Sequence, residues 1–149
     1  MFSIIRTNSG NKDFIELVKQ LDAELALRDG KDHAFYDQFN KIGNIKYVVV
    51  AYEDGRPCGC GAVKEYEPGT MEVKRMYVPD AMRGKGIAGK ILAELEHWAA
   101  ELSATKCILE TGAKQTEAIA LYKKSGYDII PNYGQYESVS NSICFEKII

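Results

Sequence analysis

Three apolar segments joined by two short turns constrain the fold of this chain more than any other feature. Residues 45–53 and 58–66 flank an Asp-Gly-Arg-Pro tetrapeptide whose glycine and proline suit a tight turn, and Pro68-Gly69 leads into residues 71–78. Turns this short connect antiparallel strands. The sequence therefore predicts a meander of three antiparallel strands, which Pro79 ends.

Segments with helical periodicity lie before and after this meander. Before it, apolar residues recur at helical spacing from Phe14 to Leu25, up to an Asp29-Gly30 stop, and a shorter helix is predicted over 34–42, ending at Gly43. After it, one apolar face runs from Ile87 to Leu102. The other predicted elements are strands over 2–6, 106–110, 127–130 and 143–148, and a helix over 116–124 with Thr116 as its cap and Ser125-Gly126 as its stop. This order predicts an α+β (mixed α/β) fold, a mixed, mostly antiparallel sheet covered by helices on both faces.

Length and composition narrow the function classes. The 149 residues predict one domain, 1–149, and 46% hydrophobic with 27% charged residues is typical of a soluble globular protein. The formal net charge of -2 provides no basic field for nucleic acid, and no apolar run is long enough to cross a membrane. The first residues do not resemble a secretory signal, so we expect a cytoplasmic protein.

The four cysteines do not complete a metal-binding pattern. Cys58-Gly59-Cys60 resembles half of a zinc site, but the next cysteine is Cys107, and the two histidines show no ligand spacing. We therefore predict no metal site and reduced thiols in buried strands.

The loop between the third meander strand and the long helix has the properties of an anion site. It reads Arg83-Gly84-Lys85-Gly86-Ile87-Ala88, so several backbone N–H groups lie at a helix N-terminus, and the two glycines let a phosphate approach them. The spacing matches neither the Walker A nor the Rossmann motif. From the loop alone, a plain glycine turn with solvated Arg83 and Lys85 remains an alternative.

With its neighbours, the loop resembles the signature of the GNAT superfamily of N-acetyltransferases, Gln/Arg-x-x-Gly-x-Gly/Ala, in which Arg83, Gly86 and Ala88 match. Residues 72–79 are similar to the strand that precedes the loop in that family. Residues 118–127, Ala-Ile-Ala-Leu-Tyr-Lys-Lys-Ser-Gly-Tyr, resemble its second motif near the C-terminus. The two motifs cover about the last half of the chain. The first half matches only in the order of its elements.

This resemblance implies direct transfer of an acetyl group from acetyl-CoA to the primary amine of a small molecule. Glu72 is the candidate base, with Glu110 as a second one, although a surface glutamate at a strand end is an alternative for Glu72. Tyr122 resembles the family's tyrosine acid, which would protonate the departing thiolate; its alternative is a core aromatic. The resemblance also implies that the cofactor contacts the loop residues Arg83 to Ala88, the backbone of Met76 and Val78, and Gln115.

The acceptor is the least determined part of the prediction. Its pocket would be formed by the first helix and the segment around Tyr133, Tyr136 and Glu137, and several carboxylates could recognise a cationic amine: Asp29, Asp32, Asp37, Glu65 and Glu67. Two rival functions remain open, a protein or peptide acetyltransferase and a non-catalytic acyl-CoA sensor. A homodimer is common in this superfamily, but the sequence identifies no interface.

Overall fold

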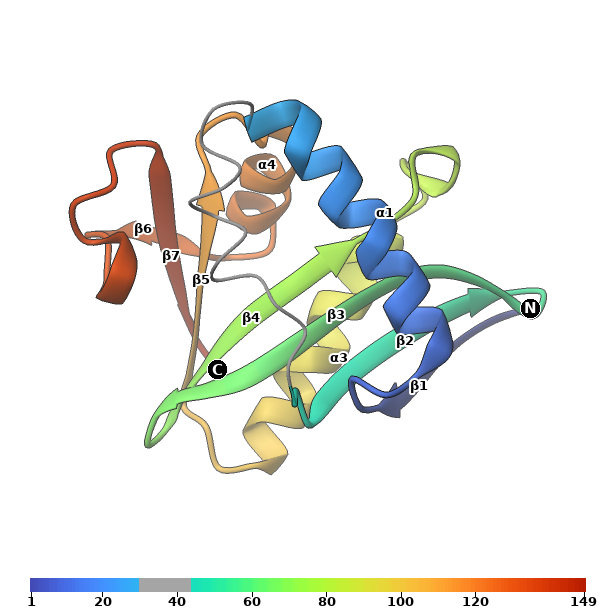
Figure 1. The fold of residues 1–149 in the computed structure, drawn as a ribbon. Helices are drawn as coiled ribbons and strands as arrows, with labels where there is room; N and C mark the ends of the chain where they lie inside the picture. Colours follow the sequence, from blue (N-terminus) through green and yellow to red (C-terminus); the bar gives the residue numbers. More distant parts are fainter. Residues whose placement is uncertain (30–43) are drawn as a thin grey trace.

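A single sheet with helices on both faces forms the protein (Figure 1). The structure is a computed structural model, and it describes residues 1–29 and 44–149. The strands are β1 (Phe2–Thr7), β2 (Tyr47–Glu53), β3 (Arg56–Glu67), β4 (Thr70–Tyr77), β5 (Lys106–Gly112), β6 (Asp128–Ile130) and β7 (Ser142–Ile148). The helices are α1 (Lys12–Asp29), α3 (Ile87–Glu101) and α4 (Thr116–Lys124), with short 3-10 turns η2 (Asp80–Met82) and η3 (Gly134–Tyr136).

The sheet is mostly antiparallel, in the order β1-β2-β3-β4-β5-β7-β6. The predicted meander is present, since β2, β3 and β4 pair antiparallel in succession. Its first turn is formed by Asp54 and Gly55, which both have positive φ, as the tightest hairpin turns require. Among the described strands, the β4–β5 pair is the parallel one. The predicted mixed sheet with helices on both faces is therefore confirmed.

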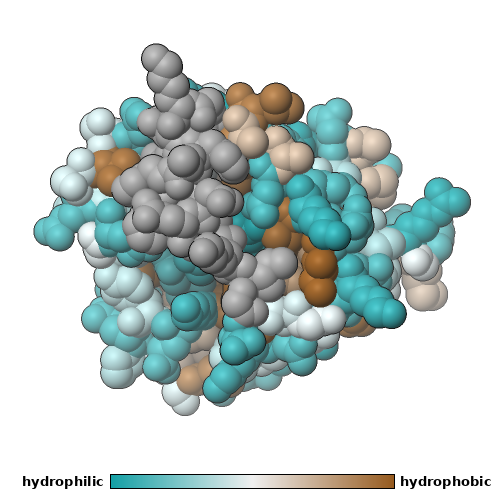
Figure 2. Space-filling view, viewed as in Figure 1, coloured by the Kyte–Doolittle hydropathy of each residue, from teal (hydrophilic) through white to brown (hydrophobic). Residues whose placement is uncertain are grey.

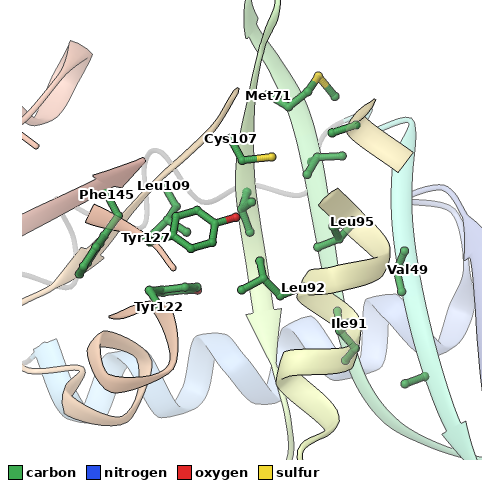
Figure 3. Close-up of a cluster of buried hydrophobic side chains, with 14 of the residues drawn as sticks. Val49, Met71, Ile91, Leu92, Leu95, Cys107, Leu109, Tyr122, Tyr127 and Phe145 are labelled. Atoms are coloured by element: carbon green, nitrogen blue, oxygen red, sulfur yellow. The ribbon is translucent and has the colours of Figure 1, made fainter. Parts of the chain in front are cut away.

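Two separate clusters of buried side chains fix the helices to opposite faces of the sheet. Phe14, Leu17 and Val18 of α1 pack on one face, against Val48 and Val50 of β2 among others. The other face packs against α3, and this larger cluster extends to α4 and β7 (Figure 3). The helix positions follow from the apolar spacing of each helix, because a helix buries one stripe against a sheet.

Strand β4 contains a bulge that the sequence analysis did not predict. Cys60 pairs with Tyr77 and Ala62 with Lys74, so one β3 residue faces two on β4, and Arg75 has φ 59. A bulge shifts the alternation of side chains by one residue. Accordingly Val73 before the bulge and Val78 after it both belong to the α3-side cluster, although their separation is odd.

Strands β4 and β5 pair over a short distance only. Their register runs from Thr70 opposite Lys106 to Glu72 opposite Ile108, and beyond this point no pairing is recorded between them. The two strands then diverge, and α4 and the upper part of α1 lie near the opening (Figure 1). This divergence separates the C-terminal half of β4 from β5.

Most predicted boundaries agree with the structure to within two residues, and one prediction is wrong. Gln115, not Thr116, is the N-cap of α4, and no side-chain hydrogen bond caps that helix. Thr116 is instead the first helical residue, because the chain already turns at Gln115, whose N–H donates to the Gly112 carbonyl. The short helix predicted over 34–42 lies outside the described residues.

The surface is mostly polar. The part of the face in Figure 2 that is drawn in colour is largely hydrophilic, with apolar residues in scattered places. Exposed large apolar residues such as Leu27, Ile129 and Ile148 belong to different elements. Of the helices in the described ranges, none combines the length and hydropathy needed to span a bilayer.

Candidate active site

The loop before α3 has an open, glycine-lined front. Gly84 and Gly86 have φ values of 81° and 79°, which favour glycine, and a Cβ on either would meet no atom within 4 Å. Gly86 is the N-cap of α3 and provides no side-chain cap. Because the first N–H groups of a helix have no intrahelical acceptor, they remain available to an anion here.

A cavity of about 370 Å³ extends from this loop across the end of β4 to α4. The loop contributes Arg83, Gly84, Gly86, Ile87 and Ala88 to its lining, and β4 contributes Met76 and Tyr77, followed by Val78. Residues of α1 and α4 close the other sides. The fit to an elongated anionic ligand rests on the open, glycine-lined loop at one end of the cavity and the mostly apolar channel beyond it.

A second cavity, of about 140 Å³, lies where β4 and β5 diverge. Charged side chains of both signs line it: Glu72, Lys74, Arg75 and Glu110. Its other walls come from α1, α4, the end of β5 and Tyr136 of η3. Polar lining in a small cavity is typical of a site that orients one ligand by a few directed contacts.

The two cavities meet at Tyr122. Five residues line both of them: Leu21, Met76, Gln115, Ala118 and Tyr122. Tyr122 is buried, and its ring lies 5.8 Å from the rings of Tyr127 and of Phe145 (Figure 3). Burial, together with the negative charge of Glu110, raises the pKa of the Tyr122 phenol above its ordinary value near 10. The hydroxyl therefore stays protonated at neutral pH. Tyr122 is therefore a core aromatic that also lines the junction, and its role as an acid stays a prediction.

Glu72 is a buried group rather than a surface residue, so the surface alternative is wrong. Its side chain is 10% exposed, and Tyr133 donates its hydroxyl proton to Glu72 Oε2 over 2.5 Å. Lys74 Nζ lies 3.6 Å from Glu72 Oε1. Burial, followed by the charge of Glu72, raises the pKa of Tyr133, which therefore acts as a permanent donor to this carboxylate. Glu110 lines the same cavity and accepts a hydrogen bond of 2.6 Å from the Ser142 hydroxyl.

Arg83 is held by carboxylates in this structure. Its Nη2 donates to both oxygens of Glu24 on α1, at 2.9 and 2.7 Å, and its Nε donates to the Val78 carbonyl at 2.8 Å. The hydrogen bonds to Glu24 raise the pKa of the guanidinium. Glu24 also lines the larger cavity, so a carboxylate lies close to Arg83, a residue expected to contact the cofactor.

The comparison with known proteins agrees with this arrangement. The sequence model of the acetyltransferase (GNAT) family matches residues 15–127, most of the chain. The chain belongs to this family. It is an acetyltransferase, as the sequence analysis predicted.

Similar proteins extend over nearly the whole chain. The IAA acetyltransferase of Azospirillum brasilense is 33% identical over 136 residues, which cover 89% of this chain and 88% of the relative. YjgM of Escherichia coli (strain K12), an N-acetyltransferase that is itself uncharacterized, is 32% identical over 135 residues. This match covers 83% of this chain and 80% of YjgM. A structure from Klebsiella pneumoniae, provisionally assigned as an acyl-CoA N-acyltransferase, has a TM-score of 0.83 at 28% identity, covering 99% of this chain and 97% of its own.

Not every predicted residue of this GNAT acetyltransferase lies at a cavity. Lys85 is exposed and lines neither one, although it neighbours Gly84 and Gly86. Gln115 lines both, and its Oε1 accepts a hydrogen bond of 3.2 Å from Arg28 Nη1. The suggested acceptor-binding carboxylates do not line the cavities as far as they are described: Glu65 and Glu67 are exposed, and Asp32, Asp37 and the Asp29 side chain lie outside the description. Glu137, from the segment expected to form the acceptor pocket, is also exposed and lines neither cavity.

The sequence analysis missed several residues that line the cavities. Lys74 and Arg75 were placed in the third meander strand without a role, although two adjacent charges in an apolar strand were a visible signal. Leu21, Glu24 and Arg28 belong to the first helix, which was expected to help form the acceptor pocket, but none of the three was named. Their position next to the glycine loop depends on long-range contacts such as Glu24 with Arg83, for which the sequence contains no local signal.

The cysteines are buried thiols in the strands. Cys58, Cys60, Cys107 and Cys144 are all unoxidised, and burial raises the pKa of Cys60 to about 12. Cys60 Sγ donates to the carbonyl of Arg75 at 3.4 Å, next to the bulge. Within residues 1–29 and 44–149, no three histidine, cysteine or acidic side chains gather as a metal site would require.

Proposed function

We propose that this acetyltransferase transfers the acetyl group of acetyl-CoA to the primary amine of a small molecule. The observation that carries the proposal is the meeting of two cavities at Tyr122 and Met76. The larger cavity begins at an anion-binding loop and suits the donor, and the smaller, charged one suits the acceptor. A thioester held in the first would face an amine in the second at their shared wall.

The loop would hold the pyrophosphate of coenzyme A. The first N–H groups of α3 would bind the phosphates, because Gly84 and Gly86 leave the front of the loop open and no side chain caps the helix. Arg83 and Lys85 would add positive charge nearby. Beyond it, the edge of β4 at Met76 and Val78 is not paired with β5, so its backbone suits an extended pantetheine arm. The amide of Gln115 lies on the same route.

Glu72 would be the base. A lysine-like amine has a pKa near 10.4, so removing its proton at pH 7 costs about 4 to 5 kcal/mol, which a nearby carboxylate lowers by accepting the proton. Glu72 lines the smaller cavity and is fixed by the Tyr133 hydroxyl. Glu110 lines the same cavity and is the second candidate.

Tyr122 would be the acid. As the neutral amine nitrogen bonds to the acetyl carbon, it releases a second proton; the carbon–sulfur bond breaks with the electron pair leaving on sulfur, and the Tyr122 hydroxyl donates a proton to the thiolate. The proton released by the nitrogen balances the one that Tyr122 gives up, so the phenol is restored. Its raised pKa keeps that proton in place through the usual assay range. The volume of the smaller cavity, about 140 Å³, is below the roughly 300–1,000 Å³ of drug-sized sites, which supports a small acceptor over a protein one.

The test compares Tyr122→Phe with Tyr127→Phe in an assay of thiol release from acetyl-CoA with a panel of amines. Tyr127 is a matched control because it is also buried, contacts the Tyr122 ring and lines neither cavity. We expect Tyr122→Phe to lower kcat by about 10²-fold or more with CoA affinity retained, and the control to keep its kcat. Wild-type binding of CoA without turnover of any amine would support the sensor function instead.

A further inference from the structure

Positive charge in the acceptor cavity points to the class of amine. We propose that the acceptor carries a carboxylate beside its amine, as an amino acid does. This inference rests on the proposed function. Two acidic and two basic side chains line the smaller cavity, so it matches a ligand with charges of both signs better than a simple cation.

Arg75 provides the strongest observation. Its side chain is 2% exposed, and its Nη2 donates to Asp22 of α1 over 2.6 Å. Its Nε is buried, and no acceptor for it is found within residues 1–29 and 44–149. A buried N–H without an acceptor is costly, and guanidinium N–H groups match the oxygens of a carboxylate. A carboxylate bound in the cavity that Arg75 lines would supply that acceptor.

The bulge in β4 explains why two adjacent cations lie on the same face of the sheet. Neighbouring residues of a regular strand point to opposite faces. With φ 59 at Arg75 and one β3 residue facing two on β4, the alternation shifts at this point. Arg75 thus reaches Asp22 of α1, on the sheet face that Lys74 shares with Glu72. The irregularity concentrates charge at the acceptor cavity.

The charges are arranged in a way that suits an orienting role. Lys74 lies 3.6 Å from Glu72, and its side chain is 14% exposed. A ligand carboxylate near Lys74 and Arg75 would therefore place a neighbouring amine close to the Glu72 carboxylate. An amine substrate without a carboxylate would leave the Arg75 Nε–H without this hydrogen-bond partner.

The test measures kcat/KM for three matched sets of acceptors with acetyl-CoA: amino acids, their amides, and the corresponding decarboxylated amines, such as phenylalanine, phenylalaninamide and phenethylamine. We expect the best amino acid to exceed both of its analogues at least tenfold in the wild type. Equal or better turnover of the analogues would overturn this inference and leave the proposed function standing. Absence of turnover with every amine, while CoA binds in calorimetry, would overturn both.

Variants test whether Lys74 and Arg75 cause the preference for an amine that carries a carboxylate. In Lys74→Met and Arg75→Met, the ratio of kcat/KM for the amino acid to that for its amide should fall toward one. Lys19→Met removes an exposed lysine of α1 outside both cavities and should keep the wild-type ratio. An unchanged ratio in both cavity variants would refute the assignment. If Arg75→Met does not fold, the ratio in Lys74→Met and the wild-type panel of acceptors still test the inference.

Discussion

Replacing Gly86 by alanine separates the binding role of the loop from its role in the fold. Gly86 has φ 79°, where a residue with a Cβ is strained by about 1–2 kcal/mol, and a Cβ there meets no atom within 4 Å. The added methyl group therefore clashes with nothing in the protein. It would lie instead in the open front of the loop.

Gly55 is a matched control. It also has φ 79°, a Cβ on it also meets no atom within 4 Å, and it lies in the turn between β2 and β3, outside both cavities. Both variants should lose about 1–2 kcal/mol of stability, which for a domain of this size lowers Tm by about 2–8 °C. Only Gly86→Ala should weaken the binding of CoA. Loss of one charge-assisted hydrogen bond to phosphate, about 1.5–3 kcal/mol, weakens CoA binding by about 10- to 150-fold.

The assay combines thermal unfolding of both variants without ligand and calorimetric titration with CoA. We expect similar Tm losses in the two variants and a difference in Kd of at least tenfold. Binding of CoA by folded Gly86→Ala within twofold of the wild type would refute a role of Gly86 in binding phosphate. A similar loss of affinity in Gly55→Ala would show that the effect is not local to the loop.

Two further predictions concern the walls of the cavities. A Cβ in Gly61→Ala would lie 2.6 Å from the Met76 sulfur, so we expect a loss of about 1–3 kcal/mol in unfolding experiments. Because Met76 lines both cavities, KM should rise for both substrates, and unchanged steady-state KM values would contradict this coupling. Glu24→Gln should tighten CoA binding about two- to tenfold in calorimetry, because it removes a negative charge next to Arg83, whereas Glu16→Gln, on the exposed side of α1, should not. Weaker binding in Glu24→Gln would show that Glu24 positions Arg83 instead of competing with the phosphates.

The sequence predicted the elements that carry a local signal. The predicted helix 116–124 coincides with α4, and the meander strands differ from β2, β3 and β4 by two residues at most. These segments have apolar periodicity bounded by glycine or proline, and periodicity is determined by neighbours along the chain. The glycine loop was found for the same reason, because its motif is contiguous.

The rest of the site depends on contacts between distant residues. The hydrogen bond from Tyr133 to Glu72 joins residues 61 positions apart, and that from Arg83 to Glu24 joins residues 59 apart. Neither leaves a pattern in the sequence near its partners. The bulge at Arg75 had a weak local signal. The adjacent charges Lys74 and Arg75 break the alternation of the strand and could have indicated the bulge.

Two irregularities of β4 together produce the candidate active site. Because β4 leaves β5 after Glu72, the backbone beyond this residue faces an opening instead of a partner strand, and buried backbone groups need partners. An extended ligand chain can supply them on the side of Met76 and Val78. The bulge then turns Arg75 to the α1 side, so the same strand contributes apolar wall to the donor cavity and charge to the acceptor cavity.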